Sequence, residues 1–144
     1  MKIKSLSVED TQNLAKELAI QSDKRIYALV GELGSGKTTF VQAFLRVVGV
    51  ANERLISPTF LIIKNYELGI RNYGGYQRAY HIDCYRLHKA QELLDLGFRK
   101  IIENPNHIVL IEWADKIREL LPRETLWIHF QHGESDGERI IEVL

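Results

Sequence analysis

The chain has 144 residues, of which 45% are hydrophobic and 26% charged, and its 19 basic and 19 acidic side chains leave no net charge. These values are typical of a single globular domain over residues 1–144, and the sequence has no basic block of the kind that binds a nucleic-acid backbone directly. It also has no apolar run of membrane-spanning length and no signal-peptide pattern, which favours a cytoplasmic protein without membrane contact.

The first predicted elements are a helix over residues 8–21 and a strand over residues 25–30. Ser7 followed by Asp10 is typical of a helix N-terminus, and apolar residues then recur at helical spacing. The next run, RIYALV, is short and rich in β-forming residues, as expected of a buried central strand.

A glycine-rich stretch, GELGSGKT at residues 31–38, follows this strand and precedes a predicted helix over residues 39–48. It matches the pattern G-x-x-x-x-G-K-[ST], which a chain of this length contains by chance roughly once in a few hundred cases. Such glycines let backbone N–H groups approach phosphate oxygens, and the N-terminus of the helix adds a partial positive charge. Lys37 would reach the β and γ phosphates, and Thr38 would offer a hydroxyl to magnesium. The alternative is a glycine-rich turn with an exposed lysine.

The middle of the chain predicts a long hairpin, with an apolar run over 61–68, a glycine-rich turn near 72–75 and a second strand over 78–85. The stretch LISPTF, residues 55–60, precedes it. Its polar turn lies where phosphate-loop proteins often have a switch segment that senses the γ-phosphate, and a simple connection is the alternative. The turn consists of Ser57, Pro58 and Thr59.

The second half of the chain alternates helices and strands. The predicted elements are two short helices over 90–102 with a break at Gly97, a strand over 107–113, a helix over 114–121 that Pro122 ends, and strands over 125–130 and 139–144. This mixture predicts an α/β fold, a three-layer P-loop NTPase-like domain with a mixed parallel and antiparallel sheet.

Two acidic residues are candidates for the magnesium side of a nucleotide site. Glu112 ends an apolar strand, where open α/β sheets place their ligands and where a nucleotide hydrolase needs a group to hold hydrated magnesium. Asp83 is the second candidate, since period-two alternation places His81, Asp83 and Tyr85 on one face of a strand. The alternatives are the start of a loop for Glu112 and a solvated hairpin face for Asp83. No Asn-Lys-x-Asp element for guanine is present, so adenine is the expected base.

Four stretches resemble the bacterial TsaE (YjeE) family: GELGSGKTTFVQ, SPTF, HIDCYRL and IEW, in that order and across essentially the whole chain. The resemblance implies the ATPase of tRNA threonylcarbamoyladenosine biosynthesis, with ATP and Mg²⁺ as cofactors and slow intrinsic hydrolysis. It further implies action with two partner proteins, TsaD and TsaB, so that tRNA is met only indirectly, through the complex.

The same resemblance assigns roles to individual residues. The expected catalytic residues are Lys37, Asp83 and Glu112, and the expected magnesium ligands are Thr38 and Glu112. The phosphates would be held by Gly34, Ser35, Gly36, Lys37, Thr38 and Thr39, and the base by Thr11, His132 and Gly133. The expected switch or partner-facing residues are Ser57, Pro58, Thr59, His81 and Trp113.

Two other functions are compatible with the same loop. A small-molecule kinase would usually need an arginine-bearing lid over the phosphates, for which only Arg71 and Arg78 are available in the hairpin. A nucleotide-dependent binding module with little turnover overlaps with the TsaE interpretation.

Overall fold

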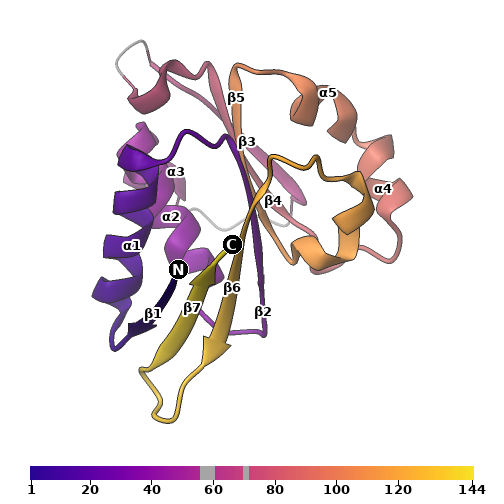
Figure 1. The fold of residues 1–144 in the computed structure, drawn as a ribbon. Helices are drawn as coiled ribbons and strands as arrows, with labels where there is room; N and C mark the ends of the chain where they lie inside the picture. The colour runs from indigo at the N-terminus through magenta and orange to yellow at the C-terminus, as the bar shows by residue number, and fades with distance from the viewer. Residues whose placement is uncertain (56–60, 70–71) are drawn as a thin grey trace.

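The structure, a computed structural model, describes residues 1–55, 61–69 and 72–144. In these ranges seven strands form one sheet in the order β1-β7-β6-β2-β5-β4-β3 (Figure 1). The strands are β1 (Lys2–Ser5), β2 (Ile26–Gly31), β3 (Ile63–Glu67), β4 (Arg78–Asp83), β5 (His107–Glu112), β6 (Leu126–His132) and β7 (Arg139–Val143).

The sheet is parallel in its centre and antiparallel at both edges. Strand β2 pairs in parallel with β5 and β6, and β4 pairs in parallel with β5. The edges are added by two hairpins, β3–β4 and β6–β7, and by β1, which pairs with β7. The predicted mixed sheet is therefore confirmed.

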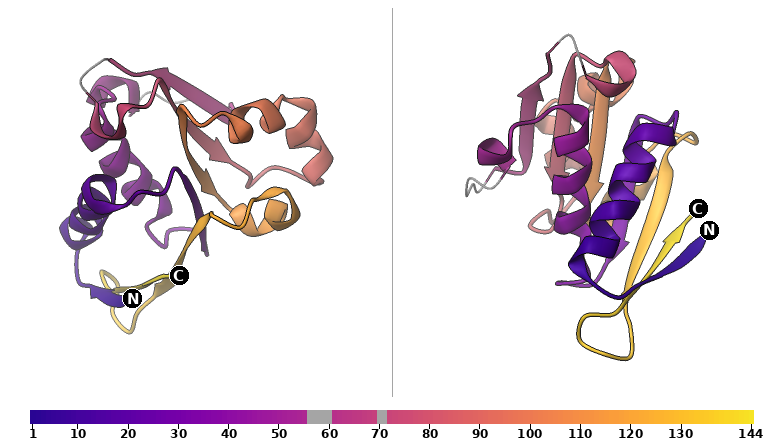
Figure 2. Two further views of the ribbon diagram at one scale, coloured as in Figure 1. Left: turned by 45° about the horizontal axis from the view of Figure 1, so that its top comes forward. Right: turned by 90° about the vertical axis from the view of Figure 1, so that its left-hand side faces the viewer.

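Helices cover both faces of the sheet, so the domain has three layers (Figures 1 and 2). One face carries α1 (Val8–Gln21), α2 (Lys37–Val48) and the short α3 (Asn52–Leu55), whereas the other carries α4 (Ala90–Asp95), α5 (Phe98–Glu103) and the 3₁₀ segment η2 (Ala114–Leu120). A further 3₁₀ turn, η1 (Tyr73–Gly75), lies in the β3–β4 connection.

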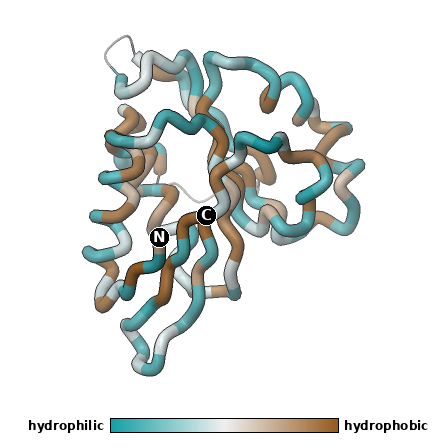
Figure 3. Tube along the Cα trace, in the orientation of Figure 1, coloured by the Kyte–Doolittle hydropathy of each residue, from teal (hydrophilic) through white to brown (hydrophobic). Residues whose placement is uncertain are grey.

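Each helical layer has its own buried core against the sheet. On the α1 and α2 side, Phe40 and Phe44 pack with Tyr27 of β2, and Phe130 of β6 meets Phe40 edge-on. The core of the other face is mostly aliphatic; it includes Ile111 of β5 and one buried aromatic ring, Phe98 of α5. Hydrophobic residues run along the central strands of the sheet (Figure 3). These two cores fix the strand ends that carry the site.

Helix α1 begins and ends at the predicted residues. Its cap is reciprocal: the Ser7 hydroxyl accepts the Asp10 N–H at 3.2 Å, and the Asp10 carboxylate accepts the N–H of Leu6 at 2.9 Å. The predicted break between two short helices at Gly97 is also confirmed, because this residue has φ 91°, a conformation that favours glycine.

Four features differ from the predictions, the first being that β4 ends at Asp83 and not at residue 85. Strand β1 was not predicted, and the segment 114–120 is a 3₁₀ helix with a kink at Ile117 in place of an α-helix. Strand β5 ends at Glu112, because Trp113 turns into the left-handed conformation. The predicted switch turn Ser57–Thr59 lies outside the described residues.

In the ranges that the structure covers, no helix is long and apolar enough to cross a membrane.

Candidate nucleotide-binding site

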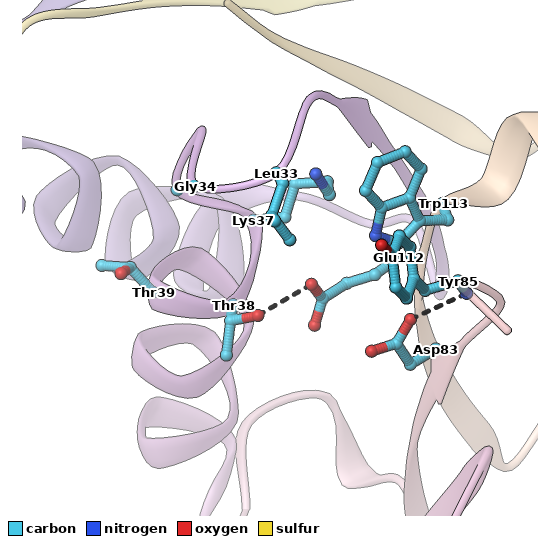
Figure 4. A pocket seen from close by; sticks show the side chains of 10 residues that line it. Leu33, Gly34, Lys37, Thr38, Thr39, Asp83, Tyr85, Glu112 and Trp113 are labelled. Carbon is cyan, nitrogen blue, oxygen red and sulfur yellow. Dashed lines mark hydrogen bonds between the residues drawn. The ribbon is translucent and has the colours of Figure 1, made fainter. Parts of the chain in front are cut away.

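The glycine-rich loop and both acidic candidates meet at one edge of the sheet. The loop follows β2, and Asp83 and Glu112 are the last residues of β4 and β5, where they are register partners. Since these three strands are parallel, their carboxyl ends lie together. A cavity of about 240 Å³ is found there (Figure 4). Its lining residues are Leu33, Gly34, Gly36, Lys37, Thr38, Thr39, Asp83, Tyr85, Glu112 and Trp113.

The backbone of the loop requires glycine at particular positions. Gly34 and Gly36 have φ values of 75° and 107°, which side chains rarely tolerate. Gly31 has no room for a side chain, because a Cβ atom there would lie 2.6 Å from the carbonyl oxygen of Phe130. Helix α2 then starts at Lys37, so its N-terminal N–H groups face the cavity side of the loop.

Lys37 is buried beneath this loop, with only 5% of its surface exposed. Its ammonium donates hydrogen bonds to three acceptors of the loop: the carbonyls of Gly31 (2.5 Å) and Glu32 (2.9 Å), and the Ser35 hydroxyl (3.4 Å). Burial lowers the pKa of Lys37, and the nearby carboxylates, Glu112 first among them, oppose that shift. A partly desolvated cation of this kind is suited to binding a phosphate.

Glu112 is held between two elements. Its Oε1 accepts the Thr38 hydroxyl at 2.8 Å (Figure 4), and its Oε2 lies 2.5 Å from Nε2 of His81. Burial raises the pKa of Glu112, but the hydrogen bond and charge of His81, the Thr38 hydroxyl and the charge of Lys37 outweigh it and lower the pKa below 4.5. The side chain is therefore an ionised carboxylate at neutral pH.

Asp83 and Tyr85 line the same side of the cavity. The Asp83 carboxylate accepts the N–H of Tyr85 at 3.0 Å, which turns the chain after β4 (Figure 4). The Tyr85 ring packs on Trp113 with 5.0 Å between ring centres. Tyr85 thus lies beyond the end of β4, and it reaches the cavity through the turn that Asp83 stabilises.

Trp113 has an unusual backbone. Its φ of 57° is the one positive value for a non-glycine residue in the described ranges. Such a conformation costs roughly 1–2 kcal/mol for an ordinary residue. It directs the indole over the loop, where the Lys37 Nζ lies 4.3 Å from the ring centre.

A second cavity, of about 230 Å³, adjoins the loop on the α1 side. Thr11, which was predicted to bind the base, lines it together with Gly34 and Gly36 of the loop and Thr39 of α2. The remaining lining residues, Ser7, Val8, Gly137 and Arg139, were not predicted. Only the fold brings the C-terminal hairpin beside the start of α1, so no local pattern signals them.

His132 and Gly133, the other residues expected at the base, do not line this cavity. His132 instead places Nε2 3.2 Å from the carbonyl oxygen of Leu33, and Gly133 packs closely on the Glu138 side chain. The guanidinium of Arg139 donates to the Gly34 carbonyl at 3.0 Å. The β6–β7 hairpin therefore supports the loop from behind.

The structure places His81 differently from the prediction. It was expected among switch or partner-facing residues, but it is 5% exposed and faces Glu112. His81 is therefore not on the surface in this structure, which contradicts the partner-facing part of the prediction. Trp113 is half-buried and lines the cavity.

The oxygens of Thr38, in the first turn of α2, and of Glu112, at the end of β5, are suited to magnesium. In the part of the chain that the structure describes, no three His, Cys, Asp or Glu side chains group as a complete metal site. Magnesium does not need one, since it commonly takes one or two protein oxygens and completes its shell with waters and substrate phosphates. Thr38 and Glu112 supply such oxygens beside the phosphate loop.

The chain matches one protein family along nearly its whole length. The family model described as "Threonylcarbamoyl adenosine biosynthesis protein TsaE" matches residues 5–141. Proteins named tRNA threonylcarbamoyladenosine biosynthesis protein TsaE are similar along nearly the whole chain. The one from Bacillus subtilis is 34% identical over 142 residues, covering 97% of this chain and 83% of its own. The one from Rickettsia conorii is 38% identical over 140 residues, covering 96% and 74%.

The fold is also shared with a solved structure. The crystal structure of YdiB from Bacillus subtilis superposes with a TM-score of 0.74 at 32% identity, covering 98% of this chain and 82% of the other. The similarity therefore extends over both helical layers and both hairpins.

Proposed function

The chain belongs to the TsaE family, and we propose that it is the ATP-binding and ATP-hydrolysing component of tRNA threonylcarbamoyladenosine biosynthesis. The observation that carries the ATPase part of this proposal is the meeting of Lys37, Thr38 and Glu112 at the carboxyl ends of β2 and β5. A phosphate loop beside an ionised carboxylate is the arrangement that nucleotide hydrolysis needs.

Each of these side chains has a separate role in binding the phosphates or Mg²⁺. The loop N–H groups and the Lys37 ammonium bind the β and γ phosphates, because both present positive charge to the cavity. Thr38 and Glu112 would hold Mg²⁺, which would neutralise charge that develops on the phosphates. Asp83 lines the cavity beside Glu112 and assists on the γ-phosphate side.

The base is assigned to the second cavity. Gly34 and Gly36 of the loop line both cavities, so a nucleotide whose phosphates lie in the loop can reach the second cavity with its base. The polar side chains that line it are those of Ser7, Thr11, Thr39 and Arg139. Adenine is the proposed base.

We propose that hydrolysis by the isolated chain is slow and that its output is a change in binding to TsaD and TsaB. The chain has no net charge, so it lacks the long-range attraction that gives most non-specific nucleic-acid affinity. A nucleotide can shift a conformational equilibrium only through contacts that differ between states. Strand β4, whose last residue Asp83 borders the phosphate side, offers such a contact.

A pull-down of TsaD and TsaB with ATP, ADP or no nucleotide tests this output, beside a gel shift with tRNA alone. Capture that depends on the nucleotide, without a shift of tRNA by the isolated chain, supports the proposal. Equal capture in all three states, or tight tRNA binding, contradicts it.

The kinase alternative gains no support from the hairpin. Arg78 is the first residue of β4, bonds to Asn65 at 3.1 Å, and lies five residues, roughly 16 Å, from the strand end that borders the cavity. It is therefore in the wrong place for a lid over the phosphates. Arg71 lies outside the described residues.

A further inference from the structure

The Glu112 carboxylate has a different partner on each oxygen. Oε1 accepts the Thr38 hydroxyl at 2.8 Å, and Oε2 lies 2.5 Å from Nε2 of His81. The His81 and Glu112 side chains are only 6% and 4% exposed. Since an ionised carboxylate can only accept hydrogen bonds, Nε2 of His81 is the donor.

The two partners come from different elements. Thr38 lies in the first turn of α2, whereas His81 lies in β4, where its register partner is Leu110 of β5. The parallel pairing of β4 with β5 therefore fixes the imidazole relative to the strand that carries Glu112. A glutamate side chain has three rotatable bonds, and one hydrogen bond would leave its carboxylate free to turn. One hydrogen bond on each oxygen restricts that rotation.

We infer that His81 is a positioning residue, which holds Glu112 so that Oε1 stays on the Thr38 hydroxyl and the pair presents a fixed set of oxygens to Mg²⁺. This inference rests on the proposed function. Outer-shell hydrogen bonds of this kind typically change metal affinity 10- to 100-fold when they are removed. His81 does not line the phosphate cavity, so it contributes to metal binding without touching the nucleotide.

Two polar replacements of His81 separate positioning from simple packing. His81→Gln keeps an N–H donor near the place of Nε2, whereas His81→Asn is equally polar but ends about one bond too short to reach Oε2. A fluorescent ATP analogue is titrated first with EDTA present, which measures binding through the loop and Lys37. A second sample of the bound complex, free of EDTA, is then titrated with Mg²⁺, and phosphate release is followed in parallel.

The expected result is a half-saturating Mg²⁺ concentration at least about tenfold higher in His81→Asn, with metal-free nucleotide affinity within about twofold of the wild type. His81→Gln should recover most of the loss, in both binding and kcat. Thermal melting of each variant checks that it is folded.

Three outcomes overturn the inference. They are an unchanged Mg²⁺ requirement in folded His81→Asn, equal losses in the Gln and Asn variants, and a parallel loss of metal-free nucleotide affinity. A wild-type chain that binds the analogue but shows no response to Mg²⁺ would instead contradict the proposed function, so the two failures are distinguishable.

Discussion

The ammonium nitrogen of Lys37 lies over the Trp113 ring, 4.3 Å from the ring centre. Trp113 directly follows the last residue of β5. Lys37 belongs to the group expected to bind the phosphates, so nucleotide binding should change the surroundings of Trp113. The chain has a second tryptophan, Trp127, which lies over Arg118 away from the cavity.

Trp113 should therefore report nucleotide binding. In a Trp127→Phe variant, whose tryptophan fluorescence comes from Trp113 alone, ATP is expected to change the tryptophan emission in a saturable way, because phosphate contacts move or neutralise the cation over the ring. The matched Trp113→Phe variant should show no such change. An emission spectrum of Trp113 that stays constant at saturating ATP would contradict this placement.

Lys37→Ala should weaken ATP binding strongly. One charge-assisted contact to phosphate contributes roughly 1.5–3 kcal/mol, which corresponds to a loss of about 10- to 150-fold in affinity. Isothermal titration calorimetry measures it, with Lys16→Ala on the exposed face of α1 as the control that keeps wild-type affinity. Wild-type affinity in Lys37→Ala would refute the phosphate-loop assignment.

Glu112→Gln should separate hydrolysis from binding. The amide keeps the shape of the side chain but loses the charge that holds magnesium, so kcat should fall by at least about tenfold while ATP affinity changes much less. Phosphate release and calorimetry on the same preparation measure the two quantities. If both are unaffected, the acidic role passes to Asp83, and Asp83→Asn becomes the informative variant.

The pKa of Glu112 also predicts how stability depends on pH. Its folded-state pKa lies below its ordinary value of 4.5, so the ionised group stabilises the fold fully above pH 4.5 and loses that contribution as pH falls through the folded-state pKa. The difference in unfolding free energy between the wild type and Glu112→Gln should therefore be largest at neutral pH and shrink below pH 4.5. Urea unfolding at several pH values measures it, and a difference that grows on acidification would contradict the sign.

The parts of the site that depend on local spacing were predictable from the sequence. Lys37 and Thr38 follow from the loop pattern, and Glu112 from its place after an apolar run, because both signals lie within one strand and its next turn. The sheet class followed from the order of strands and helices. The edge strand β1 did not, because its sequence KIKS carries no apolar run, and pairing with β7 at the far end of the chain creates it.

The interactions that depend on register and on long-range packing could not be predicted. Alternation placed His81 on the same face as Asp83, but only the pairing of β4 with β5 shows that it reaches Glu112. Arg139 enters the second cavity because the C-terminal hairpin folds back beside α1. The left-handed turn at Trp113 is a tertiary feature, since nothing in the residue type favours it.

The most direct test of the ATPase assignment is phosphate release from ATP by the purified chain, alone and with purified TsaD and TsaB, with Glu112→Gln run under the same conditions. We expect slow, Mg²⁺-dependent release by the chain alone, a clear change in rate when both partners are present, and loss of both activities in Glu112→Gln. Release that is absent in every condition, or that persists unchanged in both Glu112→Gln and Asp83→Asn, would contradict the assignment.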